Sequence, residues 1–327
     1  MEPATIAAMN PDAMLTVVVA ACNEEGCLPA LHARLSAVLS GLELTARVLY
    51  VDDGSRDGTW EAMRAIAARD ARVGLLRLSR NFGKEAALTA GLDRVTTGAA
   101  MILDADGQDP PEMIPEFVAR WREGWDDVHG TRLDRDGDGW LKRTSAHAFY
   151  RVIGRLSRTP IPRDTGDFRL LSRRALDGLA RLPERGRFMK GLFAWIGYRQ
   201  IAVPYHRQRR IAGRGNFGYW RLWNFALDGI TSFSTAPLRV AMYLGLLTAL
   251  LAFMFGLFTV IKTILWGDPA RGYPTLATII VFLGGVQLIA LGVIGEYLGR
   301  LYLEVKQRPL YLVDEWRPAN DDGVAGD

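Results

Sequence analysis

Two carboxylates and an amide follow one apolar segment in the middle of the chain. Residues 99–103 read Ala-Ala-Met-Ile-Leu, and Asp104, Asp106 and Gln108 come directly after them. Oxygen ligands of this kind suit Mg²⁺ or Mn²⁺, which keep part of their coordination shell for phosphate oxygens. Because Asp-x-Asp alone is common by chance, the preceding strand and the following proline pair are what favour a metal site that holds a nucleotide diphosphate.

Polar side chains also follow three earlier apolar segments. The candidate donor-binding residues among them are Asn23, Glu25, Asp52, Asp53 and Lys84. Lys84 lies beside a predicted helix N-terminus, where a cation and free backbone N–H groups suit an anion, although an ordinary polar turn is the alternative. Asp57 is better explained as part of a helix start than as a ligand.

A second acidic cluster resembles half of a calcium loop. Asp134, Asp136 and Asp138 have the required spacing, but the twelfth position is Ser145 where the loop needs a bidentate Glu. We interpret this segment as a solvated turn.

The elements that would position these groups alternate along the first third of the chain. Apolar runs predict strands, and helical spacing predicts helices between them. The predicted strands are 15–20, 46–51, 73–78 and 99–103, and the predicted helices are 28–42, 59–69 and 84–95. Such alternation predicts an α/β domain with a mostly parallel sheet, whose ligands bind beyond the carboxyl ends of the strands.

Two long segments near the C-terminus, residues 240–261 and 272–295, carry no charged residue. Each is long enough to cross a hydrocarbon core of about 30 Å as a helix, and the short connector makes the pair a hairpin. Basic residues are more frequent on both flanks than in the connector, which predicts two spans in the cell membrane with the main domain and both termini cytoplasmic. Two buried helices of a soluble core are the alternative.

Net charge and cysteine content limit the classes of ligand and partner that the chain can be expected to bind. The net charge is +4, and the basic residues gather between residues 132 and 221, just before the apolar segments. This arrangement favours an anionic bilayer surface and phosphate-bearing substrates, and no nucleic-acid motif stands out. The two cysteines, Cys22 and Cys27, fit neither a zinc knuckle nor a disulfide framework, and residues 1–14 lack the features of a cleavable signal.

Together these patterns predict five parts. They are an N-terminal tail (1–14), a cytoplasmic domain (15–215), interfacial amphipathic helices (216–236), a two-span transmembrane hairpin (237–299) and a cytoplasmic C-terminal tail (300–327). The third part mixes tryptophans and aliphatic residues with Arg221 and Asp228, as an interfacial helix does, although a buried core helix has a similar composition.

Several motifs carry a family resemblance. They are Val51-Asp-Asp-Gly-Ser-Arg-Asp-Gly-Thr, Asn81-Phe-Gly-Lys-Glu-Ala-Ala, Asp104-Ala-Asp-Gly-Gln-Asp-Pro-Pro-Glu, Asp164-Thr-Gly-Asp-Phe-Arg-Leu and Gly295-Glu-Tyr-Leu-Gly-Arg. The chain resembles family 2 glycosyltransferases of the polyprenyl-phosphate sugar synthase type, which include bactoprenol glucosyltransferases and dolichol-phosphate mannose synthases. The resemblance covers about residues 15–312.

The resemblance implies a GT-A type, Rossmann-like nucleotide-sugar domain and an inverting transfer of a sugar to a polyprenyl phosphate. UDP-glucose is the favoured donor, and GDP-mannose is the alternative. Similar proteins form tetramers, so a homo-oligomer is expected, with Gly284, Gly285 and Gly292 permitting close helix approach. A non-catalytic nucleotide-sugar-binding membrane scaffold is the alternative outside enzymes, and a processive polysaccharide synthase would carry an acceptor motif and further spans that we do not find.

The resemblance also implies roles for single residues. Asp106 and Gln108 face the cation, and Asp104 helps to hold metal and nucleotide. Asp52 and Asp53 line the nucleoside pocket. The residues assigned to the acceptor and the reacting centre are Arg132, Arg143 and Asp167. Departures from the family pattern stand at Gly107 and Asn216, and no role is assigned to His147.

Overall fold

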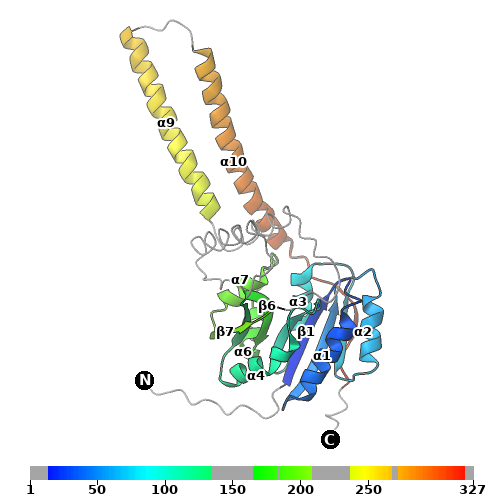
Figure 1. Cartoon of the computed structure of the whole chain (residues 1–327). Coiled ribbons are helices and arrows are strands. Elements are labelled where there is room, and N and C mark those ends of the chain that lie inside the picture. The colour runs from blue at the N-terminus through cyan, green and yellow to red at the C-terminus, as the bar shows by residue number, and fades with distance from the viewer. Residues whose placement is uncertain (1–13, 134–164, 183, 208–235, 267–271, 321–327) are drawn as a thin grey trace, which may run out of the picture.

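The computed structural model describes residues 14–133, 165–182, 184–207, 236–266 and 272–320 (Figure 1). These residues form an eight-stranded sheet with the strand order β7-β5-β6-β4-β1-β2-β3-β8. The strands are β1 (Met14–Ala21), β2 (Thr45–Asp52), β3 (Val73–Leu78), β4 (Ala99–Asp104), β5 (Asp127–Arg132), β6 (Thr165–Leu171), β7 (Gln200–Tyr205) and β8 (Val313–Arg317).

The middle of the sheet is parallel, as predicted. Strands β4, β1, β2 and β3 are parallel neighbours, so their carboxyl ends meet at one edge. The four strands predicted from the sequence are confirmed to within one residue at each end. Beyond β4, strand β6 runs antiparallel to both β4 and β5, and this reversal brings β6 next to the end of β4.

Helices cover both faces of the sheet because strand residues alternate between two cores. On β1, Val17 and Val19 face one core and Val18 faces the other. The first core is closed by α1 (Leu28–Ser40), α2 (Thr59–Ala67) and α4 (Ile114–Arg122), and the second by α3 (Lys84–Leu92), α6 (Arg173–Ala180) and α7 (Met189–Trp195). A short 3-10 turn, η1 (Pro111–Met113), leads into α4. The predicted mostly parallel α/β fold is confirmed.

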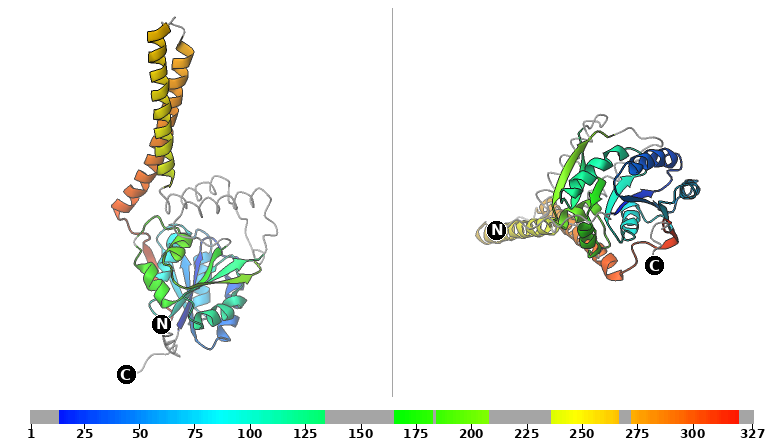
Figure 2. Two further views of the ribbon diagram at one scale, coloured as in Figure 1. Left: turned by 90° about the vertical axis from the view of Figure 1, so that its left-hand side faces the viewer. Right: turned by 90° about the horizontal axis from the view of Figure 1, so that it is seen from below.

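Two long helices, α9 (Ala236–Trp266) and α10 (Tyr273–Lys306), project from the domain as a pair (Figures 1 and 2). Within them, Val240–Phe258 and Phe282–Lys306 are long and apolar enough to cross a membrane. Almost none of these residues is buried, whereas the core helices of a soluble protein would be. The geometry therefore supports the predicted hairpin. The predicted interfacial segment, 216–236, lies almost wholly outside the described residues.

The segment predicted as a C-terminal tail, 300–327, contains regular structure. Helix α10 continues to Lys306, and β8 then pairs antiparallel with β3 at the edge of the sheet. The Tyr311 hydroxyl donates a hydrogen bond to Asp93 at the end of α3, over 2.8 Å. The segment that leaves the membrane hairpin is therefore built into the domain. A five-residue strand gives too short a pattern to distinguish it from a tail in the sequence.

Candidate active site

Lys84 is the centre of a charged cluster at the carboxyl edge of the sheet. It is the first residue of α3, and its Nζ lies 2.6 Å from Asp104 Oδ1 and 2.6 Å from Asp167 Oδ2. Burial opposes ionisation of both partners, but the two carboxylates raise the pKa of Lys84, and Lys84 with Lys190 lowers the pKa of Asp167. Lys84 and Asp167 are therefore held as ions, and the two ion pairs tie β4, α3 and β6 together at one point.

A second group lies beside this cluster. The Tyr205 hydroxyl donates a 2.7 Å hydrogen bond to Asp109 Oδ1, and Tyr205 is also hydrogen-bonded to Arg132. Burial, followed by the charge of Asp104, raises the pKa of Asp109 to about 6. Arg132 Nε is buried and makes no hydrogen bond with the described residues, so this guanidinium keeps a donor for a ligand.

Glu85 extends the cluster toward α7. Its carboxylate accepts a hydrogen bond from the backbone N–H of Met189, the first residue of α7. Burial, and then the charge of Asp167, raises the pKa of Glu85 to about 7, although Lys84 and Lys190 act in the opposite direction. Glu85 Oε2 is buried and has no hydrogen-bond partner in the described part of the chain.

The acidic residues at the end of β2, Asp52 and Asp53, accept hydrogen bonds from the backbone of the loops. Asp53 accepts hydrogen bonds from Phe82 N at 2.7 Å and Gly83 N at 2.9 Å. Asp52 accepts one from Ser55 N at 3.0 Å. The loops after β2 and β3 pack so closely that a Cβ on Gly54, which has φ +64°, would lie 2.4 Å from backbone atoms of residues 80 and 81.

The loop after β1 is joined to the same structure. Asn23 Oδ1 accepts a hydrogen bond from Arg56 N, and Glu25 Oε2 accepts one from Gly58 N. Asp57 accepts from Thr59 N, which fits the local role expected for it at the start of α2. The prediction that Asn23, Glu25, Asp52 and Asp53 contact the donor stays a prediction. The structure adds that these side chains fix the loops to one another.

The predicted metal ligands lie on the loop after β4. Asp106 Oδ1 accepts a hydrogen bond from Gln108 N over 3.1 Å, and Gly107 between them has φ +70°, which favours glycine. No set of three or more His, Cys, Asp or Glu side chains in the described ranges could hold a metal. Asp106 and Gln108 are nonetheless oxygen donors of the type that Mg²⁺ and Mn²⁺ bind when phosphate completes the shell, so these residues fit the expected group.

Other predictions fall outside the described residues. Arg143, His147, Asn216 and the calcium-like segment around Asp136 are among them. For Asp104, Asp167 and Lys84, the predicted proximity to a common site is supported by their mutual contacts.

Sequence reasoning missed four members of the cluster: Asp109, Tyr205, Glu85 and Lys190. Asp109 and Glu85 each adjoin a predicted site residue, Gln108 and Lys84, which was a usable signal. Tyr205 and Lys190 gave no such signal, because they reach the site only through the pairing of β7 with β5 and the position of α7.

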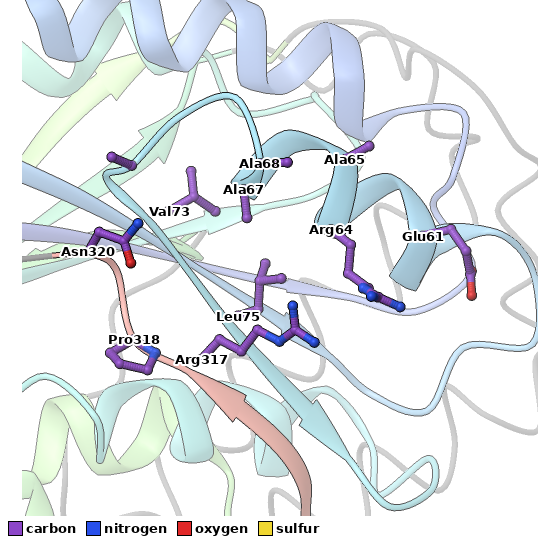
Figure 3. Close-up of a pocket in the computed structure, with 11 residues that line it drawn as sticks. Glu61, Arg64, Ala65, Ala67, Ala68, Val73, Leu75, Arg317, Pro318 and Asn320 are labelled. Carbon is purple, nitrogen blue, oxygen red and sulfur yellow. The ribbon is translucent and has the colours of Figure 1, made fainter.

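A pocket of about 540 Å³ lies elsewhere, between α2 and the end of the chain (Figure 3). Its floor includes Val73 and Leu75 in the first half of β3, and Arg64 and Arg317 line it. Lys84 follows the opposite end of β3, so this hollow is separate from the charged cluster.

Comparison with protein families decides what the domain and its hairpin are. Residues 16–179 match the family described as "Glycosyl transferase family 2", and residues 236–301 match the family described as "GtrB C-terminal hairpin". The chain belongs to glycosyl transferase family 2. It is therefore a glycosyltransferase with a GT-A type sheet and a C-terminal hairpin of two long apolar helices, and the resemblance seen in the sequence is confirmed.

Named relatives of this family 2 glycosyltransferase match over nearly the whole chain. An uncharacterized glycosyltransferase of Synechocystis sp. is 51% identical over 92% of this chain and 95% of its own. A bactoprenol glucosyl transferase of Shigella phage SfX is 45% identical over 91% of this chain and 98% of its own. Among solved structures, glucosyl-3-phosphoglycerate synthase of Mycobacterium tuberculosis, in complex with Mn²⁺, UDP-glucose and phosphoglyceric acid, is 20% identical with a TM-score of 0.48, covering 67% of this chain and 78% of that chain.

Proposed function

We propose that this enzyme transfers glucose from UDP-glucose to bactoprenol phosphate, a polyprenyl phosphate, at the cytoplasmic face of the cell membrane. The observation that carries the proposal is near full-length similarity to bactoprenol glucosyl transferases, hairpin included. The charged cluster supports it, since sugar transfer between two phosphates needs cations and oriented carboxylates.

The donor side of the site is assigned to the loop after β4 and its neighbours. Asp106 and Gln108 hold Mg²⁺ or Mn²⁺, and Asp104, fixed by Lys84, faces the same diphosphate. When bound, the metal supplies Lewis-acid stabilisation of charge on the leaving diphosphate. Asn23, Glu25, Asp52 and Asp53 shape the nucleoside pocket by fixing the loops around it.

The acceptor side is assigned to Arg132 and Arg143. A phosphate monoester is already ionised at neutral pH, so this nucleophile needs positioning more than deprotonation. The buried Arg132 Nε that has no partner in the described structure is suited to that task. Asp167, held ionised by Lys84, orients the reacting groups.

The hairpin brings the lipid to this site. We infer that both termini are cytoplasmic, so that two spans keep the charged cluster near the inner membrane surface, where the acceptor phosphate lies. Oligomerisation, up to a tetramer, stays a prediction.

A donor panel tests the proposal. Purified full-length enzyme is given polyprenyl phosphate in vesicles and radiolabelled UDP-glucose, UDP-galactose or GDP-mannose, with Mg²⁺ or Mn²⁺. We expect lipid-linked label from UDP-glucose that EDTA abolishes. Transfer from GDP-mannose alone would replace the glucosyl assignment with a mannosyl one, and binding without any transfer would identify a nucleotide-sugar-binding scaffold.

Arg132→Ala tests the acceptor side separately. Loss of charge-assisted hydrogen bonds worth roughly 1.5–3 kcal/mol predicts a ten- to hundred-fold slower transfer. Donor affinity measured by calorimetry without lipid should hardly change, and Arg132→Lys should rescue only in part, because an ammonium lacks the planar fork. An equal loss of donor affinity would assign Arg132 to the diphosphate pocket.

A further inference from the structure

A carboxylate in the last turn of α10 contacts the catalytic domain. Glu304 Oε1 accepts hydrogen bonds from the backbone N–H of Arg185 at 2.8 Å and of Gly186 at 3.2 Å. Its neighbours Leu303 and Val305 are 59% and 70% exposed, whereas Glu304 is half-buried. The side chain thus turns away from the apolar surface of α10 and toward the domain.

The segment that Glu304 holds leads directly into the charged cluster. Lys190 lies four residues after Gly186, and its charge acts to lower the pKa of Asp167 and of Glu85. Glu85 in turn accepts the backbone N–H of Met189. Residues 185–190 are therefore fixed by a carboxylate at each end, one from the membrane hairpin and one from the residue after Lys84.

The end of α10 is itself anchored to the domain. Tyr311 is bonded to Asp93, and the carbonyl of Leu312 accepts a hydrogen bond from Ser79 N over 2.9 Å. Strand β8 then pairs with β3, whose end leads into the loop that carries Lys84. The end of α10 and the segment after it thus contact two loops that border the cluster, one at residues 185 and 186 and one at Ser79.

We propose that Glu304 is a positioning residue that couples the membrane hairpin to the catalytic cluster through residues 185–190. This inference rests on the proposed function for its kinetic consequence. Two backbone donors on one carboxylate oxygen make a charge-assisted contact just before α7, which begins at Met189. Fixing that segment fixes Lys190, and hence the electrostatic setting of Asp167 and Glu85.

The test compares three full-length variants in detergent or nanodiscs. Glu304→Ala removes the acceptor, and Glu304→Gln keeps one acceptor oxygen without the charge. Glu296→Ala is the matched control, because Glu296 lies on the same helix and forms an ion pair with Arg300 of that helix. Readouts are kcat and KM with polyprenyl phosphate, donor affinity by calorimetry without lipid, and amide hydrogen exchange of residues 185, 186 and 189.

For Glu304→Ala we expect kcat to fall about ten-fold, the equivalent of one charge-assisted hydrogen bond, with donor affinity nearly unchanged. Exchange at the three amides should accelerate. Glu304→Gln should recover most of both properties, and Glu296→Ala should resemble the wild type. Rescue by Gln separates positioning from a general loss of folding.

The proposal is overturned if Glu304→Ala matches Glu296→Ala in kcat and in amide exchange, or if its kcat falls only in proportion to the folded fraction. Failure of the proposed function would instead show in the wild type, as absence of transfer to polyprenyl phosphate. In that case, amide hydrogen exchange would still show whether Glu304 holds residues 185 and 186.

Discussion

The two halves of the sheet edge hold their acidic side chains in different ways. At the ends of β1 and β2, carboxylates and an amide accept hydrogen bonds from backbone N–H groups of the loops, as at Asp53. At the end of β4 and the start of β6, charged side chains face one another, as in the Asp104–Lys84–Asp167 bridge, in which Lys84 is the first residue of α3. Backbone donors cannot be rearranged without moving the chain, whereas a lysine or arginine can exchange partners when a ligand arrives. The first half is therefore a rigid part of the site, and the second half holds the charged side chains that can respond to substrates.

The largest effect that would sharpen this contrast is expected at Asp106. Asp106→Ala removes a proposed metal ligand on the responsive side, and a metal contributes several kcal/mol, so transfer should fall at least about a thousand-fold. The melting temperature and membrane association should stay near wild type. Near-normal turnover of the purified variant, or activity unaffected by EDTA, would contradict the metal assignment.

Lys84 is expected to come next. Lys84→Met removes the cation that bridges Asp104 and Asp167, and transfer should fall about a hundred-fold. Because the Lys84 side chain is 45% exposed, water screens part of the loss, and the effect on thermal stability should be small. Initial rates and melting curves measure the two effects. A large drop in melting temperature with normal specific activity would move Lys84 to the structural half.

Asp53 tests the other side of the comparison. Asp53→Ala leaves the N–H groups of Phe82 and Gly83 without their acceptor, which costs roughly 1–3 kcal/mol of folding free energy. A melting temperature lower by several degrees is expected, with modest change in kcat per folded molecule. If donor affinity collapses while stability holds, Asp53 is a direct donor contact and the contrast fails at this residue.

The smallest expected effect is a pH dependence at Glu85. Its pKa rises from 4.5 to about 7 in the folded protein, so the folded state binds more protons than the unfolded chain between these values. The free energy of unfolding therefore falls as pH rises through that interval. Glu85→Gln should flatten the slope, which melting temperatures at about pH 5 and about pH 7.5 would reveal. An unchanged slope would assign the dependence to other groups.

The sequence was most informative where signals are local. Strand alternation and helix start signals located the first four strands and three helices closely, and the order of these elements was enough to bring Asp104 and Lys84 to one edge. The partner Asp167 required knowledge that β6 inserts antiparallel beside β4, which no local pattern encodes. The same holds for Tyr205 on β7 and for Glu304, whose contacts join segments far apart in the chain.

Strand β8 has a consequence for biosynthesis. It pairs with β3 across most of the length of the chain, and the ribosome completes it only after both hairpin helices have been made. Until then β3 presents unpaired backbone groups along the sheet edge, a template for pairing with other chains. The nascent domain can close this edge only once α10 has been synthesised, so the catalytic sheet is completed after the hairpin. Translation stalled before β8 would leave an aggregation-prone domain with its last strand missing.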